Sequence, residues 1–517
     1  MLRNHRSVLS NIAVLSNIET HDPENPHCRY IPYKVTTFKD STSETCFHFC
    51  IQGFSSLVFG RYSATTLIPP PKKMQSNDTI DRLESNIRGY VRSFPTVFQS
   101  AKGAWLTDSR GKRYLDFFAG AGTLNYGHNN PLVKKALMSY LDNDGVMHGL
   151  DTATTAKIEL LEALDEIILK PRGLDYKVQF TGPTGTNAVE AAIKLARKSK
   201  QRSHIVAFTN AYHGHSLGSL ALTGNQYYHD MSYGSHNNVT HLPYDGYLGD
   251  MDTSLLLKKM LEDGSSGLPL PAAVILETVQ GEGGINVASF EWLRRIADIC
   301  KAHDILLIVD DIQVGNGRTG TFFSFERAGI EPDIVCLSKA IGGGLPMSLV
   351  FLRRECDIWK PGEHTGTFRG NNLAFVAARQ LLEYWRDDEF GLQVGANGVR
   401  IELELKSVRE QFSSVCADIR GRGMIWGLEF DEPEMAGRVC RKAFQNGLMI
   451  ETSGARDQVV KLLPPLTISI EDLRCGLAIL TDSIQQAVGQ EPVASKFYVP
   501  DTSSLEPGIH VGSFASL

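Results

Sequence analysis

The sequence predicts an α/β protein with a large domain around a mostly parallel sheet and a smaller α+β domain. Between about residues 130 and 385, apolar runs of strand length alternate with helical patterns. This βαβα order predicts a sheet that helices cover on both faces. The run at 305–310 is isoleucine, leucine and valine up to a final aspartate, which is typical of a buried parallel strand. After about residue 386, longer helices and amphipathic strands indicate the smaller domain.

The individual elements can be placed in chain order. We expect strands of the large domain at 178–181, 204–208, 272–277, 305–310, 333–337 and 347–352. We expect its helices at 187–198, at 291–303 and around 373–386. In the smaller domain we expect strands at 424–430 and 459–463. Near the start of the globular pattern, apolar residues recur at helical spacing at Ile80, Leu83, Ile87 and Val91.

Five segments follow from these patterns. We expect an N-terminal extension at 1–78, an N-terminal part of the small domain at 79–130, the large domain at 131–385, a C-terminal small domain at 386–490 and a mobile tail at 491–517. Up to Ile18 the extension carries Arg3, Arg6, several serines and no acid, which faintly resembles a mitochondrial transit peptide. A disordered extension, or translation that begins near Met74, is the alternative interpretation.

Composition argues against several classes of function. The 517 residues include 52 Lys+Arg and 58 Asp+Glu, a net charge of −6 without a long basic run, so nucleic acid is not an expected partner. No apolar stretch approaches the ~20 residues that a membrane-spanning helix needs. The nine cysteines lack metal-ligand spacing, so no metal site is predicted. A reducing compartment is expected, the cytoplasm first and the mitochondrion as the alternative.

A single lysine and a single aspartate come at the ends of two predicted strands. Lys339 follows the strand 333–337 and precedes three glycines at 342–344, while Asp310 ends the strand 305–310. Since α/β enzymes bind ligands at the carboxyl ends of their strands, we expect both side chains at one edge of the sheet. Pyridoxal phosphate needs an amine for a Schiff base and an acid beside its ring nitrogen. The pair therefore predicts this cofactor.

Further polar residues surround the pair. Gly185 and Thr186 lie at a strand-to-helix junction, where free N–H groups and the helix dipole favour a phosphate. Tyr212 follows the strand 204–208, and Glu277 ends the strand 272–277. Each signal is weak alone. Together they place a lysine, an aspartate, a phosphate cradle and an aromatic ring at adjacent strand ends, and that combination is specific.

On these residues, about 79–490 of the chain resembles the class III pyridoxal-phosphate aminotransferases, the family of ornithine and 4-aminobutyrate aminotransferases. The resemblance implies an aspartate aminotransferase-like fold of the pyridoxal-phosphate-dependent transferases (fold type I), with the cofactor in the large domain. It implies a small-molecule amino donor and a 2-oxo acid as substrates. It also implies an obligate homodimer.

The same resemblance gives each site residue a role. Lys339 forms the Schiff base with the cofactor and later moves the α-proton of the substrate. Asp310 pairs with the pyridine nitrogen. The other implied cofactor contacts are Gly185 and Thr186 at the phosphate, Tyr212 stacked on the ring, Gln313 near the phenolic oxygen, Glu277 at its strand end, and Thr367 at the phosphate of the neighbouring subunit.

Within the family, one subgroup is more similar to the chain. The segments 117–128, 182–190, 310–315 and 367–375 are similar to the diaminobutyrate–2-oxoglutarate aminotransferases of ectoine biosynthesis. This likeness implies transfer of the terminal amine of L-2,4-diaminobutyrate, interconverting it with aspartate 4-semialdehyde, with glutamate and 2-oxoglutarate as the other pair. The alternatives are another ω-aminotransferase acting on lysine, ornithine or an amine of specialised metabolism, or a mutase or decarboxylase on the same fold.

One departure from the family concerns carboxylate binding. Many members have an arginine before a Pro-Pro-Leu run, and here Lys461 takes its place. Lysine cannot make the bidentate fork of arginine, so another cation such as Arg369 or Arg422 is a candidate helper. Glu282 occupies the position of a glutamate that pairs with this cation in the ornithine enzyme. We hypothesise that Glu282 and Lys461 form an equivalent switch; the alternative is that Glu282 is a simple loop carboxylate.

Overall fold

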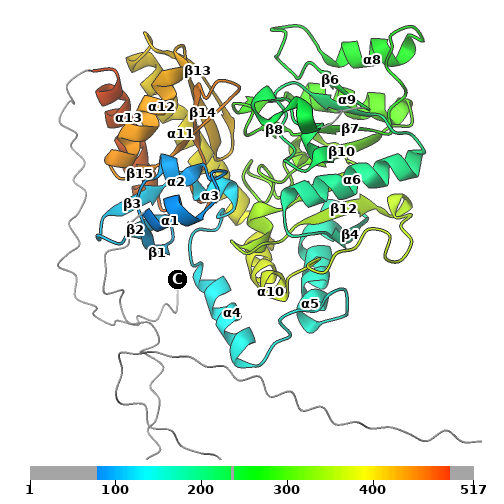
Figure 1. Cartoon of the computed structure of the whole chain (residues 1–517), viewed down its shortest axis with the longest axis horizontal. Helices are drawn as coiled ribbons and strands as arrows, with labels where there is room; N and C mark the ends of the chain where they lie inside the picture. The colour runs from blue at the N-terminus through cyan, green and yellow to red at the C-terminus, as the bar shows by residue number, and fades with distance from the viewer. Residues whose placement is uncertain (1–77, 234–237, 490–517) are drawn as a thin grey trace, which may run out of the picture. The chain divides into compact units, whose positions relative to one another are not determined.

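A seven-stranded sheet lies at the centre of the large domain, in the order β4-β12-β11-β10-β7-β5-β6 (Figure 1). The computed structural model describes residues 78–233 and 238–489. The strands are β4 (Tyr176–Phe180), β5 (Ile205–Phe208), β6 (Val239–Leu242), β7 (Ala273–Leu276), β10 (Leu306–Asp310), β11 (Ile334–Leu337) and β12 (Leu349–Arg353). Only β12 runs antiparallel to its neighbours in this sheet. The predicted mostly parallel sheet is confirmed.

Alternate residues of the central strands face two different cores. In β10, Leu307 and Val309 belong to one hydrophobic core, whereas Leu306 and Ile308 belong to another on the opposite face. Helix α6 (Gly185–Lys200) packs on the second face through fully buried small side chains such as Ala188 and Ala192. Burial on both faces explains why the strand sequence is continuously apolar.

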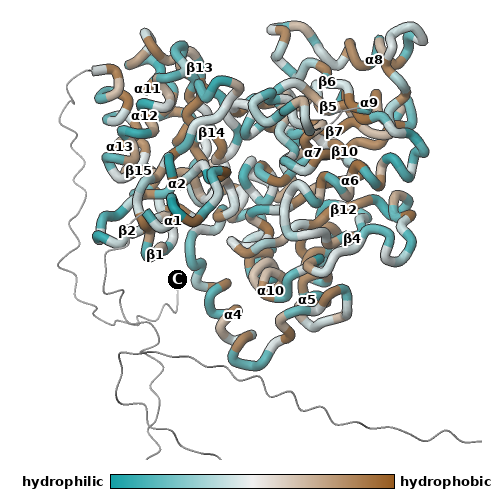
Figure 2. The backbone as a smooth tube through the Cα atoms, viewed as in Figure 1, coloured by the Kyte–Doolittle hydropathy of each residue, from teal (hydrophilic) through white to brown (hydrophobic). Residues whose placement is uncertain are grey.

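Helices of the large domain cover both faces of the sheet. Figure 2 shows hydrophobic and hydrophilic residues alternating along α6. The other helices of this domain are α4 (Pro131–Asp142), α5 (Thr155–Ala163), α7 (Leu217–Leu220), α8 (Ser254–Glu262), α9 (Phe290–Ala302) and α10 (Asn372–Leu381). Helix α9 begins at the N-cap Ser289, whose hydroxyl accepts from the Trp292 N–H at 3.1 Å. Such a cap satisfies one of the unpaired N–H groups at a helix start.

An antiparallel sheet in the order β13-β14-β17-β16 forms the centre of the smaller region. Its strands are β13 (Cys416–Arg422), β14 (Ile425–Phe430), β16 (Glu451–Ser453) and β17 (Val459–Leu462). The accompanying helices are α11 (Glu389–Gln411), α12 (Pro433–Gln445) and α13 (Ile470–Ala487). The predicted change of pattern after residue 386 therefore coincides with a change of architecture.

The N-terminal part of the described chain joins this smaller region. Strands β1 (Phe98–Lys102), β2 (Trp105–Asp108) and β3 (Arg113–Asp116) form a sheet whose fourth member is β15 (Leu448–Met449). Strand β15 pairs in parallel with β3. The pairing supports the grouping of 79–130 with 386–490, and the domain boundaries remain a prediction.

The expected helical spacing near residue 80 does not produce one helix. The structure has two short helices, α1 (Asp78–Leu83) and α2 (Tyr90–Ser93), and the side chains of Leu83 and Ile87 are 68% and 90% exposed. A short helix is stable only when tertiary packing supports it, and these apolar residues have no such support within the described chain. The periodicity was therefore misleading here.

The predictions about residues 1–77 and 490–517 lie outside the described residues. Among the helices of 78–233 and 238–489, none is long and apolar enough to cross a membrane.

Candidate active site

The site lies at the carboxyl ends of neighbouring strands β7, β10 and β11. In the sheet, Val309 is opposite Leu276, and Asp310 is opposite Cys336. Glu277, the residue after Leu276, therefore lies beside Asp310, as the sequence predicts for strand ends at one sheet edge. Lys339 begins a 3-10 turn directly after β11 and Ser338.

Asp310 is held by a buried histidine. Its Oδ2 lies 2.7 Å from His213 Nδ1, and both side chains are nearly inaccessible. Burial by itself would lower the pKa of His213, but the hydrogen bond and the charge of Asp310 outweigh it and raise that pKa. The pair fixes the direction of the Asp310 carboxylate at the end of its strand.

Glu277 serves as an acceptor for two backbone N–H groups. Tyr212 N donates to its Oε1 at 3.0 Å and Gly281 N to its Oε2 at 3.3 Å. Burial raises the pKa of Glu277 to about 7, with His213 opposing and Asp310 adding to the shift. Glu277 thus ties the loop that carries the Tyr212 ring to the strand edge.

Lys339 is half-buried and has a left-handed backbone, with φ +50°. A non-glycine residue in this region is strained and is found preferentially at functional sites. Burial lowers the pKa of Lys339, against the charge of Glu282, which raises it. A lowered pKa increases the fraction of the neutral, nucleophilic amine.

Gln313 links the strand edge to the smaller region. Its Nε2 donates to Ala121 O and to Glu282 Oε1, each at 3.0 Å. Its Oε1 is buried and has no hydrogen-bond partner within the described chain. A Cβ atom added at Gly281 would lie 1.7 Å from this oxygen, so only glycine permits this close approach.

Glu282 and Lys461 are in direct contact. Lys461 Nζ donates to Glu282 Oε1 at 2.8 Å and lies 2.9 Å from Oε1 of a second carboxylate, Glu451. Burial alone would raise the pKa of Glu282, but Lys461 lowers it to about 2. Burial raises the pKa of Glu451 to about 7 despite the lysine. The sequence paired Glu282 with Lys461 correctly and missed Glu451.

Hydroxyl groups gather at the start of α6. Thr186 Oγ1 lies 2.6 Å from Ser216 Oγ and 2.5 Å from Ser219 Oγ, and Ser216 also bonds Glu190 at 2.5 Å. Gly185 is the first residue of the helix, where unpaired N–H groups attract an anion. This is the geometry expected of a phosphate cradle.

Three predicted residues lie away from this cluster in the described chain. The carbonyl of Thr367 accepts from His148 Nε2 at 2.9 Å. Arg369 bonds Thr365 at 3.5 Å, and its charge lowers the pKa of Lys157 after burial. Arg422 donates to Ala288 O at 2.6 Å.

The expected roles of Arg369, Arg422 and Thr367 all remain predictions. Arg422 also stacks over the Phe290 ring, 4.3 Å from its centroid. Neither Arg369 nor Arg422 contacts Lys461 in the described chain, and their expected help in binding a substrate carboxylate remains a prediction. Thr367 was expected at a neighbouring subunit, and that expectation remains a prediction.

Sequence reasoning missed four residues of the site. His213 stood in a Tyr-His-Gly sequence that signalled no specific contact, and Ser216 and Ser219 carried no pattern of their own. Glu451 becomes visible only through the pairing of β16 with β17. A strand prediction at 451–453 was the one signal that could have found it.

The comparison with known families decides the class. The family described as Aminotransferase class-III matches residues 88–484. The chain belongs to the class III aminotransferases. Members of this class depend on pyridoxal phosphate, so the chain is a pyridoxal-phosphate-dependent transaminase.

Several curated relatives are similar over nearly their whole length. A diaminobutyrate–2-oxoglutarate transaminase of Wolinella succinogenes is 58% identical over 409 residues, 79% of this chain and 96% of that protein. One from Vibrio parahaemolyticus is 55% identical over 410 residues, 79% and 97% of the two chains. Among solved structures, an ornithine aminotransferase of Toxoplasma gondii superposes with a TM-score of 0.70 at 26% identity, covering 80% of this chain and 94% of that chain. These structures share the predicted fold type I architecture.

The residues of the site fit the cofactor chemically. Unpartnered buried atoms, Gln313 Oε1 and His213 Nε2, remain among the described residues beside Asp310 and Glu282. The start of α6 offers N–H and hydroxyl donors to a phosphate. The set contains an amine, a carboxylate and an anion cradle, which are the groups that pyridoxal phosphate requires.

Proposed function

We propose that the protein is an ω-aminotransferase that takes the terminal amine of L-2,4-diaminobutyrate and delivers it to 2-oxoglutarate. The observation that carries the donor is the 58% identity over 96% of the length of a transaminase named for this pair. The electrostatics support this proposal, because Lys339 interacts with a charged cluster that can receive the non-reacting end of an amino acid. That cluster consists of Glu282, Lys461 and Glu451.

Each cofactor contact has a candidate residue in this chain. Pyridoxal phosphate, when bound, supplies an electron sink for the carbon that carries the reacting amine. Asp310, oriented by His213, would hold a proton on the ring nitrogen, and Gly185 and Thr186 would hold the phosphate. Tyr212 would cover one face of the ring, and Gln313 Nε2 or Oε1 would reach its phenolic oxygen.

Lys339 is the proposed general base. Burial lowers its pKa, which increases the fraction of the neutral amine that can accept a proton. In the donor half-reaction its Nζ would take the proton from the carbon that bears the reacting amine, and in the acceptor half-reaction it would deliver a proton to the carbon of the 2-oxo acid that receives the amine. The charge of Glu282 limits the lowering, so the two residues are electrostatically linked.

Glu282 and Lys461 are proposed as a substrate-dependent switch. The 2.8 Å contact between them occupies the lysine when no second carboxylate is present. A dicarboxylate such as 2-oxoglutarate would displace Glu282 and take its place on Lys461. Gln313, which already bonds Glu282 at 3.0 Å, offers the displaced carboxylate an alternative partner.

A homodimer with Thr367 at the partner's phosphate is the proposed assembly. The loop near Thr367 exposes apolar side chains, with Met147 57%, Leu150 46% and Phe368 66% exposed. His148 joins these segments, because it bonds the Thr367 carbonyl and its ring meets that of Phe368 at 5.3 Å. Exposed apolar patches of this kind mark interaction surfaces. Sedimentation of the Phe368→Glu variant should show a shift toward monomer together with weaker cofactor binding.

The donor is tested by the absorption spectrum of the purified protein. Adding L-2,4-diaminobutyrate without a 2-oxo acid should bleach the band of the bound cofactor, and 2-oxoglutarate should restore it. Bleaching by glutamate, lysine or ornithine but not by diaminobutyrate would keep the transaminase and reject this donor. Release of carbon dioxide without need for a 2-oxo acid would instead favour a decarboxylase.

A further inference from the structure

The two carboxylates that hold Lys461 come from different kinds of structure. Glu451 begins β16 and is the direct cross-strand partner of Lys461 on β17. Glu282 lies in the turn between β8 (Val279–Gln280) and β9 (Asn286–Val287). The exposed fractions of their side chains are 8% and 24%. Glu451 is the more buried partner and belongs to a strand, whereas Glu282 belongs to a loop.

The loop carboxylate, Glu282, has a second hydrogen-bond partner, whereas the strand carboxylate, Glu451, has no second ion-pair partner within the described chain. Glu282 shares its Oε1 with Gln313, and its turn is tied to β13 by Arg420, which donates to Gly284 O at 2.9 Å. Within the described chain, Lys461 is the one residue that forms an ion pair with Glu451. Movement of Glu282 would therefore leave the contact between Glu451 and Lys461 in place.

The net charge of the cluster affects how strongly a substrate carboxylate can bind at Lys461. One lysine and two carboxylates carry a formal charge of −1. When a substrate carboxylate replaces Glu282, it meets a lysine that Glu451 still partly neutralises. Like charges at close range in a buried site repel strongly. An ammonium group at the non-reacting end of a substrate would instead be attracted.

We propose that Glu451 is a specificity-determining residue, which weakens the binding of dicarboxylates at Lys461 and favours substrates whose non-reacting end also carries an ammonium group. The inference rests on the proposed function, since the non-reacting end of diaminobutyrate carries an α-ammonium beside its carboxylate, whereas the non-reacting end of 2-oxoglutarate carries a carboxylate alone. It assigns the preference for the diamine to a strand residue, beyond the loop switch of Glu282.

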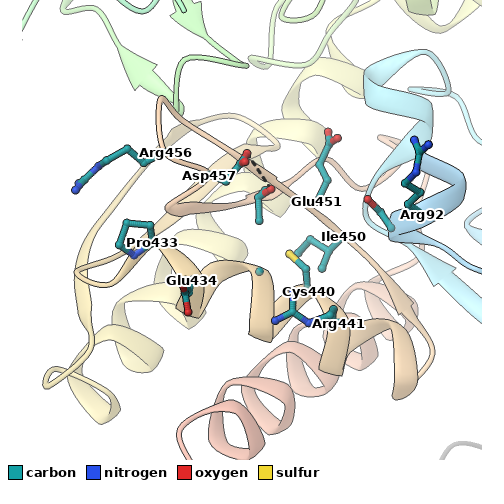
Figure 3. A pocket seen from close by; sticks show the side chains of 12 residues that line it. Arg92, Pro433, Glu434, Cys440, Arg441, Ile450, Glu451, Arg456 and Asp457 are labelled. Carbon is teal, nitrogen blue, oxygen red and sulfur yellow. Dashed lines mark hydrogen bonds between the residues drawn. The ribbon is translucent and has the colours of Figure 1, made fainter. Parts of the chain in front are cut away.

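The surroundings of Glu451 permit substitution. It lines a cavity of about 620 Å³ between α2 and α12 (Figure 3). The guanidinium groups of Arg92, Arg441 and Arg456 lie on different sides of this cavity and do not converge on one point (Figure 3). A shortened side chain at Glu451 would enlarge this cavity and would overpack no neighbour.

The test is equilibrium binding of glutarate, a dicarboxylate that cannot react. Titration calorimetry at pH 8 on the cofactor-loaded protein should show about tenfold tighter binding to Glu451→Gln than to the wild type, since close charge pairs couple on this scale. Glu451→Ala should change the affinity in the same direction. Glu451→Asp keeps the charge and should bind glutarate as weakly as the wild type.

A matched control removes a carboxylate from the same cavity without touching Lys461. Asp457 lines the cavity and accepts from Thr452 Oγ1 at 3.2 Å (Figure 3). Asp457→Asn should bind glutarate with wild-type affinity. If glutarate bound Asp457→Asn as tightly as it binds Glu451→Gln, the effect would come from the overall negative charge of the cavity. That result would overturn the specific role of Glu451.

The pH dependence gives a second readout. Because the pKa of Glu451 is about 7, the difference between the wild type and Glu451→Gln should shrink from pH 8 to pH 6. The titratable and charged groups around Glu451 are Lys461, Glu282, Lys339, Tyr90 and Cys440, together with Arg92, Glu434, Arg441, Arg456 and Asp457 of the cavity. They are present in both proteins, so a difference measurement isolates Glu451.

The outcomes separate this inference from the proposed function. Unchanged or weaker glutarate binding in Glu451→Gln and Glu451→Ala overturns the role of Glu451, whatever the donor. Failure of diaminobutyrate to bleach the wild-type spectrum overturns the donor, whatever the glutarate affinities are. Tighter glutarate binding in both variants, with Asp457→Asn unchanged, supports the inference.

Discussion

The charged groups at the strand edge around Asp310 and those in the cluster around Lys461 are positioned by different kinds of structure. At the strand edge, Asp310 and Glu277 follow neighbouring parallel strands of one sheet. At the cluster, the charges come from a loop, from β16 and from β17. The first arrangement is set by a single sheet and suits one cofactor that all members of the class share. The second depends on how separate segments meet, and so it can differ between members with different substrates.

The largest effect should come from the strand edge. Lys339→Ala removes the proposed general base, so turnover should fall by about 10³-fold or more. The cofactor should still bind through the phosphate cradle and Asp310. Borohydride reduction followed by mass spectrometry should show no cofactor fixed to the chain. Turnover close to that of the exposed-lysine control Lys406→Ala would refute the role of Lys339.

A smaller loss of rate is expected when the side chain at Asp310 keeps its shape but loses its charge. Asp310→Asn should slow the donor half-reaction by about 10²-fold, the scale of a preorganised electrostatic contact. The amide cannot hold a proton on the ring nitrogen, and it removes the ion pair with His213. Stopped-flow absorbance measures the rate. A comparable loss in Asp311→Asn, the neighbouring carboxylate that bonds Ser324 instead, would point to general disruption of the strand.

Substitution of the loop residue Glu282 should alter substrate selectivity more than the rate of turnover. Glu282→Ala frees Lys461 for a substrate carboxylate, so the preference for the diamine donor over glutamate should fall by about tenfold. The ratio of kcat/KM for the two donors is the measurement. An unchanged ratio contradicts the switch and leaves Glu282 as a simple loop carboxylate.

The smallest expected effect is on stability. It compares one carboxyl group of each region, Glu277 at the strand edge and Glu451 in the cluster. The pKa of Glu277 and of Glu451 is about 7 in the folded state, above the ordinary 4.5. The folded state therefore binds their protons more tightly, and the free energy of unfolding should fall as pH rises from about 4.5 to 7. Glu277→Gln and Glu451→Gln should each flatten this fall by about 1 kcal/mol or more.

Urea unfolding at pH 5 and pH 8 checks this expectation. Because each variant removes one titrating group, the two should flatten the curve to a similar degree. Flattening in one variant alone would show that burial is uneven between the two regions. A steeper fall in either variant has the wrong sign and would contradict the raised pKa of that carboxyl.

The sequence by itself determined the α/β class, six of the seven strands of the large sheet, and the residues at the ends of those strands, whereas β6 was missed. It did so because a strand buried on both faces must be apolar throughout, so that a polar residue marks its end, as at Asp310 and Lys339. The neighbouring strand order then brings such residues to one edge, and the predicted lysine, aspartate and phosphate turn lie there. Local patterns were enough for these features.

Only the tertiary structure decided the rest. Glu451 is far from Glu282 in the chain, and its contact with Lys461 follows from the register of β16 on β17. His213 acquired its role from a 2.7 Å approach to Asp310 across 97 residues of chain. The helical spacing at Ile80 to Val91 misled for the same reason, because a pattern of apolar residues forms a buried helix only where another surface packs against it. Such pairings depend on segments meeting in space, and no local pattern of residues encodes them.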